Sequence, residues 1–353
     1  MSKPTITSLD KSRVEIKASV DATTFDSYKG RALERLAAVV KIDGFRPGHV
    51  PANVLEKQVG DAGIMEEMAQ LAIMDLYPTL LTDNKIDAIG RPEIHITKMA
   101  MGNDLEFTIT TAVMPKVTLA DYKKIAKSEN GKEVSVAVDE KDVDAAVLEL
   151  RQMRAHQEMH DKGVEHHDHD HTKIDEKDLP EITDDFVKTL GKFEGIEDFK
   201  TKLRENLLKE KTDREAEKKR IAIIDGVIEG STIDLPDMLV DFELDKMLQQ
   251  FAYDISMMGM TMEDYLKRIE KTEAELKQEW RTNAEKRAKM QLILDEIAAK
   301  EKLVPTDEEI QAEVAKIMDM YKDQGDVSEE RARAYVTQIL TNAKAFEYLE
   351  GLK

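Results

Sequence analysis

The spacing of apolar residues changes along the chain, and this change constrains the fold more than any other feature. Residues 14–20 alternate between apolar and polar, as in a half-buried strand, and the stretch from Asp21 then takes helical spacing. Alternation returns on both sides of Gly102-Asn103-Asp104, which predicts a hairpin. Beyond Leu179 nearly every stretch has helical spacing. The pattern predicts an α+β N-terminal domain followed by an extended, mainly α-helical C-terminal part.

Composition agrees with long helices. Of 353 residues, 35% are charged and only 5% aromatic, which favours solvated helices with thin cores. The net charge of −20 argues against a broad grip on nucleic acid, so any RNA contact must be local. The chain has no cysteine, as expected of a cytoplasmic protein, and neither a signal peptide nor a membrane-spanning segment is expected from its apolar runs.

These patterns divide the chain into four expected segments. An α+β domain covers 1–115, and a linker with the first helix of the C-terminal domain covers 116–155. A polar, His-rich loop covers 156–178, and a helical domain covers 179–353. The expected domain sizes are typical of units that fold independently.

The most informative short segment runs from Gly44 to Pro51, between two expected helices. Gly44 and Gly48 allow backbone angles closed to other residues, whereas Pro47 and Pro51 stiffen the turn. The segment is therefore expected to form a preformed, exposed tip.

Phe45 and Arg46 lie in this tip and allow two interpretations. An exposed aromatic ring beside an arginine suits docking onto a partner surface, with Arg46 binding phosphate or carboxylate. Alternatively, Phe45 folds back and holds the two helices together. The residue pattern alone leaves both open.

The octapeptide resembles the ribosome-binding signature of the trigger factor family, Gly-Phe-Arg-x-Gly-x-x-Pro. The resemblance continues through 90–94, 113–122 and 179–186 into the helical half. It implies that the N-terminal domain binds the large ribosomal subunit, both protein and RNA, near the exit tunnel through Gly44, Phe45, Arg46, Pro47, Gly48 and His49. It also implies that the helical domain binds nascent and unfolded polypeptides without a cofactor, and it allows self-association of the free protein. Many members carry lysine where Pro47 and His49 stand, so weaker ribosome affinity is expected.

Family members usually insert a prolyl-isomerase domain between the positions of His156 and Leu179. Here the interval is too short, and no Phe, Tyr or Trp occurs between Tyr122 and Phe186 to line a proline pocket. We therefore expect no isomerase activity. The sequence also lacks a P-loop and a nucleophile elbow, so neither ATP use nor another enzyme activity is expected.

The His-rich segment offers His166, His167, His169 and His171 as ligands for a transition metal. A polar tract provides no second shell to fix ligand geometry, so weak binding by a solvated linker is the favoured interpretation. A metal-handling protein is the alternative function that this tract keeps open.

A methionine-rich stretch supplies the expected client contacts. Flexible thioethers can adapt to unrelated apolar sequences, which suits a chaperone surface, although ordinary core packing is the competing interpretation. The candidates are Met257, Met258, Met260 and Met262. A holdase or assembly factor that works without the ribosome would keep this surface and make no use of the tip.

Overall fold

The computed structural model forms two compact units, one built from Met1–Ala120 with Gly230–Asn342 and the other from Asp121–Glu229 with Ala343–Lys353. It describes residues 3–43, 45–46, 48–132, 135–161, 174, 179–321 and 328–353. Both units are discontinuous in sequence, which apolar spacing cannot reveal. As functional regions, the four expected segments stay a prediction.

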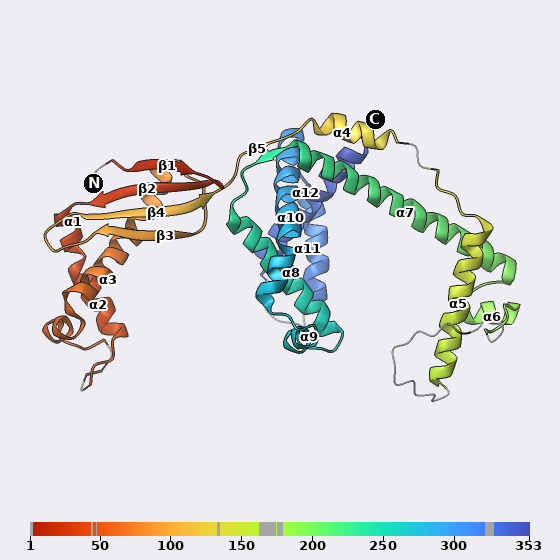
Figure 1. Cartoon of the computed structure of the whole chain (residues 1–353), viewed down its shortest axis with the longest axis horizontal. Helices are drawn as coiled ribbons and strands as arrows, with labels where there is room; N and C mark the ends of the chain where they lie inside the picture. Colours follow the sequence, from red (N-terminus) through yellow and green to blue (C-terminus); the bar gives the residue numbers. More distant parts are fainter. Residues whose placement is uncertain are drawn as a thin grey trace. The chain divides into compact units, whose positions relative to one another are not determined.

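The first unit contains a four-stranded antiparallel sheet (Figure 1). Its order is β1-β2-β4-β3, so β1 and β3 are the edge strands. The expected strand and hairpin are confirmed, whereas the N-terminal edge strand was not expected. The strands are β1 (Thr5–Leu9), β2 (Arg13–Val20), β3 (Ala88–Lys98) and β4 (Leu105–Val113).

Three helices pack on this sheet: α1 (Ala22–Ser27), α2 (Lys29–Val39) and α3 (Ala52–Asp83). Their shared core includes Phe25 and Ile64 from the helices and Phe107 from β4, all buried. Gly60 has a φ of 75° inside α3 and separates the two helical runs that the sequence predicts there. The α+β fold class of the N-terminal part is thus confirmed.

The rest of the first unit is mainly helical. The two-residue strands β5 (Val117–Thr118) and β6 (Thr232–Ile233) pair with each other. The capping boxes expected at Thr272 and Thr306 are both present, because each threonine exchanges hydrogen bonds with the glutamate three residues later. The helices are α8 (Asp237–Met257), α9 (Met262–Arg268), α10 (Glu273–Glu301), α11 (Asp307–Tyr321) and α12 (Glu329–Glu350).

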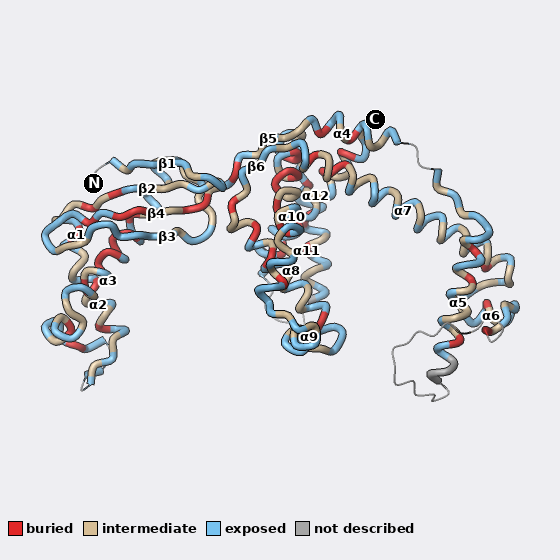
Figure 2. Tube along the Cα trace, in the orientation of Figure 1, coloured by how far each residue is buried: buried red, intermediate tan, exposed pale blue. Residues whose placement is uncertain are grey.

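The second unit consists of α4 (Tyr122–Asn130), α5 (Glu140–Asp161), α6 (Asp184–Leu190), most of α7 (Ile196–Gly230) and the end of α12. A small core joins α5, α6 and α7, with Phe199 packed edge-on against Phe193. Long stretches of α7 are exposed or half-buried (Figure 2), as expected of thin helical cores.

The boundary expected at His156 is wrong. Helix α5 continues to Asp161, because helical spacing says little about where a polar helix ends. The remaining part of the expected 156–178 loop lies outside the described residues except for Ile174.

Candidate functional site

The tip between α2 and α3 is held by backbone hydrogen bonds. The Gly48 N–H donates to the Ala37 carbonyl at 2.8 Å, which ties the tip to the last turn of α2. Gly48 has a φ of 84°, a conformation that favours glycine. The His49 N–H donates to the Arg46 carbonyl at 3.0 Å. These bonds fix the backbone before any partner arrives, as the sequence predicts for a preformed tip.

A separate apolar cluster lies below the tip. Ala37, Val50 and Leu55 are buried there and join the end of α2 to the start of α3. Phe45 is 40% exposed and, among the described residues, is not a member of this cluster. Residues other than Phe45 therefore form the core between the two helices, which favours the docking interpretation, and the role of Phe45 stays a prediction.

The exposed ring has polar and apolar neighbours in sequence that are also exposed. Arg46 and His49 are exposed in the tip, and Val39 at the end of α2 is exposed as well. Figure 1 shows this tip projecting away from the sheet. Gly44 and Pro47 lie outside the described residues.

The four candidate methionines differ in exposure. Met257 and Met258, at the end of α8, are 72% and 78% exposed, whereas Met260 and Met262 are half-buried. Met257 is the last residue of α8, whereas Met262 is the first residue of α9 after the Thr261 N-cap. Only the first pair offers thioethers fully to a partner.

Aromatic packing holds α9 to the helices beside it. The Phe251 ring on α8 packs edge-on against Tyr265 of α9 and Trp280 of α10, with both centroid distances 5.2 Å. The opposite face of α8 carries Phe242 and Tyr253, which are both exposed. Thus α8 has one face in the core, and its opposite face exposes two aromatic rings beside polar residues such as Lys246.

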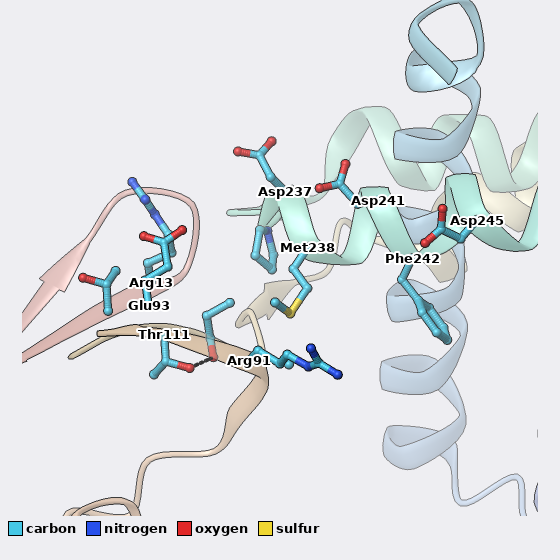
Figure 3. A pocket seen from close by; sticks show the side chains of 13 residues that line it. Arg13, Arg91, Glu93, Thr111, Asp237, Met238, Asp241, Phe242 and Asp245 are labelled. Atoms are coloured by element: carbon cyan, nitrogen blue, oxygen red, sulfur yellow. Dashed lines mark hydrogen bonds between the residues drawn. The ribbon is translucent and has the colours of Figure 1, made fainter. Parts of the chain in front are cut away.

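A cavity of about 950 Å³ lies between the sheet and α8 within the first unit (Figure 3). Met238 and Phe242 project from α8 on the side where Arg91 lies. Gly90, with a φ of 72°, leaves room for Met238, because a β-carbon there would overlap its sulfur. The cavity thus combines apolar surface with charged groups of both signs.

The charges around the cavity are partly paired. Lys11 donates to Asp237 at 2.6 Å, and this hydrogen bond lowers the pKa of that carboxyl below its ordinary value. Arg281 also contacts Asp237 at 2.6 Å and Asp241 at 3.2 Å. The Asp234 carboxylate accepts from the Lys11 and Ser12 N–H groups, which fixes the β1–β2 turn against the start of α8.

Sequence reasoning did not identify this cavity as a site. Only the resemblance over residues 90–94 drew attention to one of its walls. The other wall comes from α8, far along the chain, and no local pattern brings the two together.

The described residues contain no cluster of His, Asp or Glu arranged to hold a metal. His166, His167, His169 and His171 lie outside the described residues, so their predicted weak metal binding stays a prediction. Among the residues that the structure describes, no helix combines the length and apolar character that a bilayer crossing needs.

Two family models match most of the chain. The model for the bacterial trigger factor protein matches residues 2–150, and the model for its C-terminus matches residues 195–350. The chain belongs to the trigger factor family. Membership confirms the predicted family, the fold class and the function of a ribosome-associated molecular chaperone. The two trigger factor segments leave only residues 151–194 between them.

Trigger factors of known sequence align over nearly the whole chain. The protein of Halalkalibacterium halodurans is 27% identical, over 87% of this chain and 88% of its own length. That of Halothermothrix orenii is 28% identical, over 98% of this chain and 94% of its own length. The similarity therefore includes both the α+β and the helical regions.

A solved structure shares the fold. It is described as "Promiscuous Substrate Recognition in Folding and Assembly Activities of the Trigger Factor Chaperone", and it aligns with all of this chain at a TM-score of 0.53 and 18% identity. At this identity the likeness concerns the fold alone. It agrees with the trigger factor assignment made from the family models.

Proposed function

We propose that this trigger factor docks beside the exit tunnel of the large ribosomal subunit through residues 44–49, in the cytoplasm. The observation that carries the proposal is the exposed Phe45 side chain in a tip held by backbone hydrogen bonds, one of them from the Phe45 N–H to the Ile42 carbonyl at 3.1 Å. An aromatic ring that becomes buried only on docking can supply a large share of an interface's binding energy.

Arg46 is proposed to contact ribosomal RNA or an acidic side chain. Its guanidinium is exposed and offers a planar set of donors that matches a phosphate or a carboxylate. Since the chain carries a net charge of −20, a local positive group at the tip is needed to approach RNA. The same net charge opposes self-association of the free protein, so we propose that any dimer is weak.

The helical region is proposed to shield nascent and unfolded polypeptides. Met257 and Met258 present mobile thioethers at the end of α8, and Phe242 and Tyr253 extend the apolar surface along that helix. Such a surface accepts many apolar sequences because its side chains adapt to each of them. Met260 and Met262 are proposed to contribute less, since they are half-buried.

We further propose that the chain is not an enzyme. The interval between the matched segments is too short for the isomerase domain, and chain shielding by apolar contact needs no nucleotide. The proposed shielding without nucleotide is tested by light scattering of a chemically denatured protein diluted into buffer with the full chain, with and without ATP. We expect equal suppression of aggregation in both. A strict requirement for ATP, or no suppression at all, would overturn the proposed ATP-independent shielding.

A further inference from the structure

The long edge strand β3 is exposed at the side of the sheet (Figure 1). Within the described chain it pairs with β4 alone and has 11 residues, against 5 for the other edge strand, β1. The pairing with β4 shifts register between Ile89 and Glu93 and again between Ile96 and Lys98, and Pro92 has no N–H. The regular edge whose backbone donors and acceptors are open to another chain therefore covers residues 93–96.

The apolar face of the sheet extends onto this edge. Ile94 and Ile96 pair across the ladder with Ile109 and Phe107, which are buried. Ile94 and Ile96 are nevertheless 44% and 40% exposed, because the helices that cover β4 do not cover β3 equally. Figure 2 shows the same change from buried to exposed colouring between β4 and β3.

We propose that β3 binds an extended apolar segment of an unfolded client by strand addition. Backbone hydrogen bonds along residues 93–96 would hold the segment whatever its sequence, and Ile94 and Ile96 would contact alternate side chains of it. This inference rests on the proposed shielding of unfolded chains, and it adds a second client surface in the α+β domain, far along the chain from Met257 and Met258.

Charge favours a client segment over a second copy of this protein. Two copies of this chain, each with a net charge of −20, repel each other. Unfolded client segments do not share a common negative charge, so the same repulsion does not apply to them. Arg91 and Glu93 of the strand line the cavity together with Asp241 and Asp245, and these two aspartates already pair with Arg281 at 3.2 Å and with Lys277 at 2.8 Å. The extended backbone and the apolar side chains of the segment, not its charge, therefore determine the fit.

The test uses the full chain and a defined peptide. The probe is a fluorescein-labelled octapeptide of alternating valine and threonine with one added lysine at each end, and binding is followed by fluorescence anisotropy. Ile96→Lys places a charge on the β3 edge. Ile6→Lys is the matched control, since Ile6 is 39% exposed on the opposite edge strand. We expect Ile96→Lys to weaken binding at least fivefold and Ile6→Lys to weaken it less than twofold.

A modified peptide separates strand addition from side-chain contact and needs no variant. One version is N-methylated at the odd-numbered residues and the other at the even-numbered residues. Both keep the side chains, and each lacks the backbone donors on one edge of the extended peptide. We expect at least one to bind fivefold more weakly.

Three results would overturn the inference: binding of both methylated peptides as tight as that of the unmodified peptide, equal losses in the two lysine variants, or a dimer of the wild-type chain that Ile96→Lys dissociates in sedimentation. If the wild-type chain suppresses aggregation but does not bind the peptide, the proposed binding at β3 is refuted and the proposed shielding function is not. A chain that does neither would refute the proposed function as well.

Discussion

Phe251→Ala tests how α9 is held, and Trp280 reports the outcome directly. The chain has a single tryptophan, and its ring lies 5.2 Å from that of Phe251. Phe251 also packs against Tyr265, so its removal cuts the aromatic link between α8, α9 and α10.

The expected cost follows from burial and ring geometry. Because Phe251 is half-buried, truncation loses roughly half of the 3–5 kcal/mol typical of a core Phe→Ala change. The two edge-on pairs add about 0.5–1.5 kcal/mol each. We therefore expect the free energy of unfolding of this helical region to fall by about 2.5–5.5 kcal/mol.

The assay is urea unfolding followed by Trp280 emission. With a urea dependence of about 2 kcal/mol per molar, the midpoint should fall by roughly 1–3 M. Phe242→Ala is the matched control, because Phe242 lies on the exposed face of the same helix and contacts Lys246. We expect this control to cost under about 1 kcal/mol. Equal midpoints for the two variants would refute the assigned packing.

Three further predictions concern catalysis, metal and pH. The chain should not accelerate isomerisation of a proline tetrapeptide, and catalysis that an FK506-type inhibitor abolishes would contradict this. Replacing His166, His167, His169 and His171 by alanine should remove weak zinc binding measured by calorimetry and leave aggregation suppression intact; a melting temperature raised by many degrees with zinc would show a structural site instead. The hydrogen bond from Lys211 lowers the pKa of Asp142 below 3.8, so its stabilisation is present above about pH 4 and is lost as pH falls through the lowered pKa. Asp142→Asn should therefore flatten the acid dependence of stability in α5 and α7, and an unchanged pH profile would refute that role.

Much of the secondary structure could be predicted because it depends on neighbours in sequence. The Thr272 and Thr306 boxes each need a partner only three residues away, and the hairpin follows from alternation around one turn. The exposed tip that contains Phe45 could also be predicted, because its glycines and prolines determine the backbone conformation locally.

Other features depend on residues far apart in the chain. Val117 pairs with Ile233, and Gly90 makes room for Met238, yet none of these residues signals its partner. The cavity and the discontinuous units also depend on contacts between residues far apart in sequence, so local patterns did not predict them. The four candidate methionines were grouped by composition, but only Met257 and Met258 are largely exposed, and composition does not indicate which side chains of a group pack against other helices.

The most direct test of the central claim is co-sedimentation of Phe45→Ala/Arg46→Ala with ribosomes. Truncating an aromatic anchor typically costs about 2 kcal/mol or more, and loss of Arg46 adds to this. We expect binding to be abolished, with melting temperature and aggregation suppression unchanged, because Phe45 lies outside the cluster of Ala37, Val50 and Leu55. Wild-type binding should weaken with salt, but only modestly for one charge. A well-folded double mutant that sediments with ribosomes like the wild type would contradict the assignment of this tip.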